Sequence, residues 1–172
     1  HNQAMMEFGA MLCKPKNPAC GICPVRTGCY AFTNNTTTTL PVKIIKVKIK
    51  QRYFNYFLFT DGDIILMNKR AENDIWANMY DLPMIEATSP GSLEELLVIP
   101  DTINYFGKEV EISAVSGVKK HVLTHQHLYV RFITLAVQPV VIMPNWVFIK
   151  VENLRKLPLP KPIFIFLDNF LN

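Results

Sequence analysis

The sequence lacks any apolar run of the roughly eighteen residues that a membrane-spanning helix needs, and it shows no secretory signal peptide. Cysteine is absent everywhere except between residues 13 and 29, where all four occur. These absences argue against a membrane-spanning protein and against a disulfide-stapled secreted one. The 172 residues, 49% of them hydrophobic, are enough for one full domain with a small appendage, and we expect a soluble protein.

Acidic residues are nearly missing from the first part of the chain. Residues 1–52 contain eight Lys and Arg against one acid, Glu7, a balance of +7. Residues 53–172 contain ten against thirteen, a balance of −3. The charge distribution predicts that a polyanion such as a nucleic-acid backbone contacts the N-terminal part first.

The four cysteines form the strongest motif. Cys13, Cys20, Cys23 and Cys29 are separated by six, two and five residues, with prolines and glycines between them that break regular structure. A loop that brings four sulfurs to one point can be held by an iron–sulfur cluster, by zinc or by disulfides. Only Cys20 and Cys23 have the short spacing typical of a zinc knuckle, so the spacing favours an iron–sulfur cluster over zinc.

The pattern Cys-x6-Cys-x2-Cys-x5-Cys, with Pro24 directly after the third cysteine, resembles the [4Fe–4S] loop of the endonuclease III superfamily of DNA glycosylases. Within that superfamily it is most similar to the MutY family of adenine glycosylases, and residues 2–12 look like the last helix before the loop. The resemblance implies a structural [4Fe–4S] cluster on the four cysteines, with zinc as the alternative. Lys14, Lys16 and Arg26 are then candidates for DNA phosphate contacts.

The chain is predicted to have three parts. Residues 1–30 form the helix end and cluster loop, and residues 31–41, rich in threonine, form an exposed linker. Residues 42–172 form the second domain. It opens with a strand over 42–50 in which apolar residues alternate imperfectly with lysine.

The second domain is predicted to be α+β. A hairpin turn at 61–63 separates the first two strands of the aromatic-rich core. The expected strands cover 53–60, 64–68, 103–115, 122–137 and 146–150, and the expected helices cover 92–97 and 161–171. Strands interrupted by two helices at wide intervals favour this class over an alternating α/β fold.

The hairpin, Arg70 and the segment 76–83 together resemble the opening of the Nudix fold. The acidic catalytic box of that family, Gly-x5-Glu-x7-Arg-Glu-x2-Glu-Glu-x-Gly, is not found after Pro83. Glu94 and Glu95 form the only adjacent acidic pair there, and they suit the first turn of a helix. We therefore expect a Nudix-like domain without nucleotide hydrolysis, as the MutY family carries after its cluster.

Three histidines, His121, His125 and His127, lie within seven residues, and on one continuous strand they could share a face. A metal site is less favoured there than solvated or hydrogen-bonded histidines, since the segment holds no acid. The segment resembles the Phe-Ser-His loop of the MutY family, with Leu123, Thr124 and His125 on its three positions. The resemblance implies contact with 8-oxoguanine, with an aliphatic wedge replacing the aromatic one. A turn with structural hydrogen bonds only is the alternative.

The resemblance as a whole implies the C-terminal part of an adenine glycosylase that acts on 8-oxoguanine·adenine mispairs in double-stranded DNA. In the family the catalytic glutamate and aspartate precede the cluster. Glu7 lies too late to be either, so we expect this chain to be inactive alone. The chain starts without Met on an amphipathic stretch, which we interpret as a fragment.

The short linker resembles that of bacterial members, which implies a cytoplasmic, nucleoid-associated protein, and we expect a monomer.

The rival interpretation is a zinc-binding adaptor whose Nudix-like domain binds a nucleotide or a protein. Counting iron and sulfide would separate the two interpretations.

Overall fold

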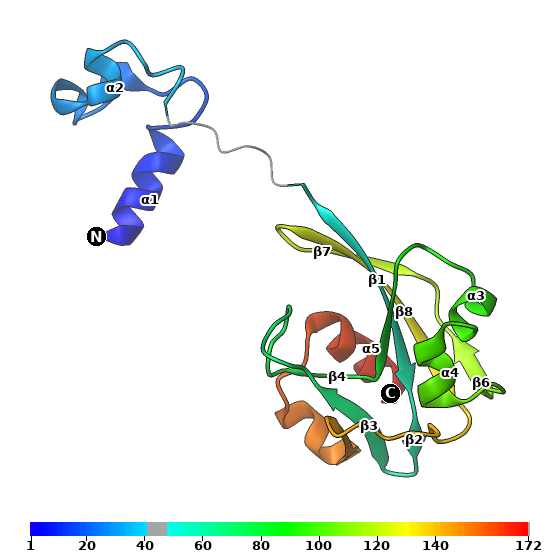
Figure 1. Ribbon diagram of the computed structural model, residues 1–172. Coiled ribbons are helices and arrows are strands. Elements are labelled where there is room, and N and C mark those ends of the chain that lie inside the picture. Colours follow the sequence, from blue (N-terminus) through cyan, green and yellow to red (C-terminus); the bar gives the residue numbers. More distant parts are fainter. Residues whose placement is uncertain (41–47, 172) are drawn as a thin grey trace. The chain divides into compact units, whose positions relative to one another are not determined.

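The computed structural model describes residues 1–40 and 48–171 (Figure 1). The chain divides into two units, residues 1–47 and 48–172, and each is described by itself. Of the strand predicted over 42–50, residues 42–47 lie outside the described residues. Within the two described ranges, no helix is both long and apolar enough to cross a membrane.

The first unit consists of short helical segments. They are α1 (Asn2–Met11), the 3-10 turns η1 (Cys20–Ile22) and η2 (Arg26–Gly28), and α2 (Tyr30–Thr33). Residues 34–40, which the sequence predicted as linker, form hydrogen-bonded turns that include Leu40 N–H to the Thr36 carbonyl at 2.9 Å. None of residues 1–40 is buried, so this unit has no hydrophobic core of its own.

The second unit contains two sheets. The first has the strand order β5-β1-β8-β6, with β7 also paired to β8, and the second has the order β2-β3-β4, with β9 paired to β3. Strands β1 and β8 are parallel, and the other pairs are antiparallel. The strands are β1 (Lys50–Leu58), β2 (Thr60–Asp61), β3 (Ile64–Lys69), β4 (Tyr80–Asp81), β5 (Met84–Ala87), β6 (Ile112–Val115), β7 (Lys119–Val122), β8 (Gln126–Leu135) and β9 (Trp146–Lys150). The helical segments are α3 (Leu93–Leu97), α4 (Pro100–Phe106), η3 (Val151–Lys156) and α5 (Lys161–Leu171).

The second half of the central strand β1 is covered on both faces, since every residue from 54 to 58 is buried. Alternate side chains such as Phe54 and Tyr56 join the core that includes α5, where the rings of Phe132 and Phe166 stack at 3.8 Å. Phe57 joins the opposite core and stacks on Phe106 of α4 at 4.1 Å. This mixed arrangement confirms the predicted α+β class.

Several predicted elements are present at or near the expected positions. The hairpin at 61–63, the strand 146–150 and the helix 161–171 are found. Helix α3 begins with a capping box, in which Ser92 Oγ accepts from Glu95 N–H at 3.2 Å and Glu95 Oε2 accepts from Ser92 N–H at 3.2 Å.

The strand predicted over 103–115 is wrong for its first half. Residues up to Phe106 form α4, and only Ile112–Val115 form a strand. Pro100 lies in the first helical turn, and Gly107, with φ +87°, follows the last helical residue. Thr102 and Phe106, four residues apart, are the positions that α4 buries.

Candidate cluster site and recognition turn

The cysteine loop is shaped by its backbone. The Ala19 N–H donates to the Leu12 carbonyl at 2.9 Å, which closes the loop between the first two cysteines. Asn17 lies inside that loop with φ +52°, a left-handed conformation that asparagine tolerates better than most residues. Because the closing bond joins the residues that directly precede Cys13 and Cys20, these two cysteines are brought to the same end of the loop.

The other two cysteines each end a 3-10 turn. The Cys23 N–H donates to the Cys20 carbonyl at 3.3 Å, and the Cys29 N–H donates to the Arg26 carbonyl at 3.2 Å. Both cysteines leave their turn in an extended conformation, with ψ of 120° and 114°. The proline- and glycine-rich sequence thus folds into two similar 3-10 turns, each ending at one of these two cysteines.

All four cysteines line one hollow of about 70 Å³. Its other walls are mainly apolar side chains, among them Phe8, Leu12, Val25 and Leu40. Each cysteine is a free thiol, with Cys13 exposed and the other three partly buried. Within the described ranges no three His, Cys, Asp or Glu side chains already form a ligand set for a single ion. Four thiols around one apolar hollow are a donor set that suits an iron–sulfur cluster.

The three predicted phosphate contacts lie on the surface of the first unit. Lys14 and Lys16 are exposed, and Lys14 also lines the cysteine hollow. The Arg26 guanidinium lies 5.4 Å from the Phe32 ring centroid, and its Nη1 donates to the Gly21 carbonyl at 3.5 Å. Arg26 therefore also braces the loop that carries the cysteines.

Residues 123–125 form the turn between β7 and β8. The Leu123 N–H donates to the Gln126 carbonyl at 2.8 Å, and the Lys50 N–H donates to the His125 carbonyl at 3.1 Å. Thr124 and His125 are exposed, whereas Leu123 is partly buried and packs against the core. The continuous strand predicted over 122–137 is therefore wrong, because a turn interrupts it and β8 runs from Gln126 to Leu135.

The three histidines, which could share a face on one continuous strand, do not all do so. In the β7–β8 ladder His121 pairs with Leu128, and Val122 pairs with His127. Adjacent pairs of a ladder point to opposite faces, so His121 and His127 lie on opposite sides of the hairpin. His121 faces the core side, where its ring centroid lies 6.0 Å from that of Trp76.

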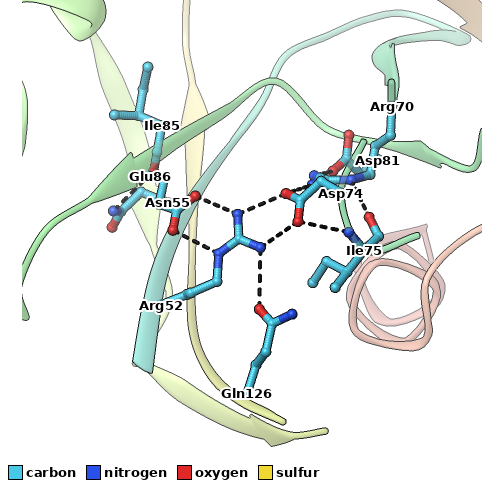
Figure 2. Close-up of polar contacts among 9 residues, drawn as sticks. All are labelled: Arg52, Asn55, Arg70, Asp74, Ile75, Asp81, Ile85, Glu86 and Gln126. Carbon is cyan, nitrogen blue, oxygen red and sulfur yellow. Dashed lines mark hydrogen bonds and ion pairs between the residues drawn. The ribbon is translucent and has the colours of Figure 1, made fainter. Parts of the chain in front are cut away.

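A network of charged side chains anchors the strands beside this turn (Figure 2). The buried Arg52 of β1 donates to both carboxylate oxygens of Asp74 and to both of Glu86, at 2.6–2.8 Å. Its Nη1 also donates to Gln126 Oε1 at 3.3 Å, the side chain that directly follows the turn. Since Gln126 starts β8, Arg52 fixes the end of the turn relative to β5 and to the segment before β4.

The second half of the network centres on Arg70. It donates to the fully buried Asp81 at 2.7 Å and to Asp74 at 2.7 Å (Figure 2). The hydrogen bonds from Arg52 lead the contributions that hold the pKa of the Asp74 carboxyl at about 2, with help from the Ile75 N–H. Burial raises the pKa of Asp81, and the nearby Arg70 opposes that rise.

Sequence reasoning missed this network. Arg52 and Glu86 are 34 residues apart, and Arg52 and Asp74 are 22 apart. The only local signal was an arginine on the buried face of an aromatic strand, since Arg52 alternates with Phe54 and Tyr56. A buried arginine requires carboxylate partners, but the sequence does not say which ones.

The second unit matches a known family. Residues 55–169 match the family described as NUDIX domain, which is more than half of the chain. The chain belongs to the NUDIX domain family. The match covers all strands from β2 onward, the last four residues of β1, and all but the last two residues of α5.

The cysteine loop matches a second family. Residues 13–29 match the iron-sulfur binding domain of endonuclease III, and the match begins and ends at the first and last cysteine. The chain thus carries an iron–sulfur site ahead of its NUDIX domain. Cys13, Cys20, Cys23 and Cys29 are the residues that would hold the cluster.

Curated relatives have the same name in several organisms. An adenine DNA glycosylase of Buchnera aphidicola subsp. Baizongia pistaciae is 25% identical over 169 residues, covering 94% of this chain and 45% of the relative. The adenine DNA glycosylase of Arabidopsis thaliana is 32% identical over 98 residues, covering 49% of this chain and 16% of the relative. This chain spans less than half the length of these relatives. A cluster segment followed by a NUDIX domain corresponds to the C-terminal part of a MutY-type adenine DNA glycosylase.

Solved structures confirm the fold. The C-terminal domain of mouse MUTYH, in a complex with human PCNA, aligns with a TM-score of 0.50 and 11% identity, covering 69% of this chain and 86% of that one. A MutT protein from Methanosarcina mazei Go1 aligns with a TM-score of 0.52 and 18% identity, covering 71% and 94%. The predicted Nudix-like architecture is therefore correct.

Proposed function

We propose that this chain is the lesion-recognising part of an adenine DNA glycosylase that removes adenine from 8-oxoguanine·adenine mispairs during base-excision repair. The observation that supports the proposal is the presence, in one chain and in this order, of an endonuclease III cluster segment and a NUDIX domain. The partner is double-stranded DNA. The protein acts as a monomer in the cytoplasm, associated with the nucleoid.

The cluster is a [4Fe–4S] centre with a structural role. Cys13, Cys20, Cys23 and Cys29 would hold it, and the bound cluster would fix the two 3-10 turns and the closed loop before Cys20 around one point. The exposed Lys14 and Lys16, together with Arg26, then face the DNA backbone and contribute phosphate contacts that carry no sequence information.

The β7–β8 turn supplies lesion recognition. The Thr124 hydroxyl both donates and accepts hydrogen bonds, and the exposed His125 ring offers a further polar atom to a base edge. Leu123 holds the turn on the core through its partly buried side chain. Arg52, through Gln126, is a positioning residue for the same turn.

The 172-residue chain does not release adenine by itself. The chemistry of the family requires a glutamate acid and an aspartate that stabilises the cationic sugar. In the first unit Glu7 is the single acid, and it is exposed on α1. A complete enzyme flips the adenine out of the helix before cleaving its glycosidic bond.

The test uses the full-length enzyme with Thr124→Ala and His125→Ala combined. Single-turnover adenine release is measured on duplexes containing 8-oxoguanine·adenine and guanine·adenine. We expect the ratio of the two rates to fall about tenfold, the equivalent of one lost polar contact to a base. Gln138→Ala, an exposed change after β8, is the control that should keep the ratio. Equal loss on both duplexes, or no loss on either, would contradict the proposed role.

A further inference from the structure

Two tyrosines stack on the face of the first sheet that is turned toward α3. Tyr53 of β1 and Tyr129 of β8 are register partners, and their rings lie 5.1 Å apart with an interplanar angle of 19°. Both are only partly buried. Neither ring belongs to the lesion-recognition turn. Neither ring packs in the core that contains α5, because Phe54 and Val130 occupy the side of these strands that faces it.

A cleft of about 240 Å³ opens beside this pair. Its lining residues come from the sheet and from the segment 88–92, which leads from β5 into α3. Ala87 is the register partner of Tyr53 on β5, and its single methyl leaves room next to the tyrosine ring. Arg131 Nη2 donates to the Gly91 carbonyl at 2.6 Å, which ties the segment across the sheet and keeps the cleft in place.

The walls of the cleft combine aromatic, polar and basic groups. Asn55, only 6% exposed, and Arg131 line the floor, and Ser89 lines the covering segment. Just outside, Lys120 Nζ lies 5.8 Å from the centroid of the Tyr129 ring. His127 lies on the same face of β8, two residues before Tyr129.

Two carboxylates lie nearby and are accounted for. Glu95 lines the cleft, and its Oε2 accepts from Ser92 N–H in the capping box at 3.2 Å. Glu94 is fully exposed, and Arg131 is close enough to help lower the pKa of its carboxyl, after the larger effects of Ser92 and the backbone. Two cationic side chains, Lys120 and Arg131, therefore lie at the cleft, against one solvent-exposed carboxylate, Glu94.

We propose that this cleft binds an unstacked nucleotide of single-stranded DNA. A base stacks beside the tyrosine pair, its polar edge meets Asn55 and Ser89, and the phosphate on its sugar meets Lys120. Aromatic rings beside basic side chains on a sheet face are the combination by which proteins hold single strands without reading sequence. The proposal rests on the proposed function only in taking DNA as the partner. It adds a second contact, on strands that lead directly into the recognition turn.

The test measures binding of a fluorescein-labelled oligodeoxyadenylate of about eight nucleotides to the 172-residue chain by anisotropy. We expect Tyr129→Leu to weaken binding about tenfold and Tyr129→Phe to leave it within about twofold, because the ring and not the hydroxyl makes the stack. Ala87→Leu, which fills the space beside the Tyr53 ring and leaves both tyrosines in the chain, should weaken binding similarly. Thermal melting confirms that each variant is folded. Phe148→Leu, an exposed aromatic on the second sheet, is the matched control.

A parallel titration with deoxyadenosine monophosphate distinguishes a nucleotide within a DNA strand from a free nucleotide. Binding of the oligonucleotide with at least tenfold preference over the monophosphate supports the proposal. Equal binding of the two overturns it in favour of a free-nucleotide site. Folded Tyr129→Leu and Ala87→Leu variants that bind the oligonucleotide like the unchanged chain also overturn it. If Thr124→Ala with His125→Ala does not change the ratio of adenine-release rates on the two duplexes, the proposed function is contradicted. The single-strand site does not depend on that result.

Discussion

Arg52 and Asp74 form a two-point pair, with Nη1 2.6 Å from Oδ1 and Nη2 2.8 Å from Oδ2, although they lie 22 residues apart in the chain. The guanidinium is buried and the carboxylate is about one-third exposed. The same arginine reaches Glu86 and Gln126, so one side chain joins the segment before β4 to β5 and to the start of β8. The stability and the pH response of the second unit depend on this pair.

Acid should weaken the second unit through Asp74. Its pKa of about 2 in the folded chain lies below the ordinary 3.8, so ionised Asp74 stabilises the fold above about pH 4. This contribution, about 1 kcal/mol after solvent screening, is lost as the pH falls from 4 to 2. Asp74→Asn should therefore be less stable than the unchanged chain at pH 6, and the difference should shrink by pH 2. Urea unfolding at several pH values measures it, and a constant difference would contradict the assignment.

Removing the Arg52 guanidinium should lower the free energy of unfolding more than removing the charge of an exposed arginine does. Arg52→Met keeps an unbranched apolar side chain but removes the guanidinium that lies 4.7 Å from the Phe54 ring centroid, and it leaves Glu86 without its arginine partner. We expect the free energy of unfolding to fall by about 2 kcal/mol. This is less than the usual cost of breaking a fully buried ion pair, because both carboxylates are partly exposed. Urea midpoints with unchanged m-values report the loss.

The matched control is Arg155→Gln. Arg155 is 80% exposed and lies 3.6 Å from Asp168, a geometry that contributes at most about 0.5 kcal/mol. Equal losses for the two arginine variants would show that the network around Arg52 does not stabilise the unit.

The capping box of α3 gives a local test. Ser92→Ala removes the oxygen that accepts the Glu95 N–H, and we expect a loss of about 1 kcal/mol. Ser89→Ala, an exposed serine three residues earlier, should change stability by less than about 0.5 kcal/mol. Since α3 packs Leu96 into the core, the difference should appear in global unfolding.

Metal content tests the cysteine site. The purified chain should contain about four iron and four sulfide per molecule, and Cys20→Ser should lose most of both. Thr27→Ser, an exposed change in the same loop, should keep them. One zinc per chain under anaerobic, iron-replete expression would contradict a [4Fe–4S] centre. The melting temperature of the second unit should be unchanged by Cys20→Ser, since the substitution lies in the first of the two compact units.

The sequence predicted elements whose signals are local. Ser92 with Glu95 marks a helix start, and the prolines at 158–162 precede α5, so both helices were found. Helix α4 was missed because Ile103 and Tyr105 alternate as in a strand, whereas Thr102 and Phe106 are the buried pair. The turn at 123–125 contains no glycine or proline, so nothing in its composition separated it from a strand.

The candidate sites were predictable to different degrees. Four cysteines within seventeen residues carry their own spacing signal, and the family match to 13–29 agrees with it. The partners of Arg52 lie 22, 34 and 74 residues away along the chain, and Tyr53 stacks on Tyr129 through the pairing of β1 with β8. Contacts of this kind depend on register, which the order of residues along one strand does not specify.

Residues 1–40 contain no buried side chain, and their apolar groups meet at the hollow that the cysteines line. A segment of this size without a core gains its free energy of folding largely from the cluster that it binds. Cluster insertion and folding are then a single event for this unit. Iron limitation or oxidative loss of the cluster would turn it into a protease-sensitive segment, while the NUDIX domain stays folded. Iron supply would thereby set what fraction of the chain carries a folded first unit, independently of how much is synthesised.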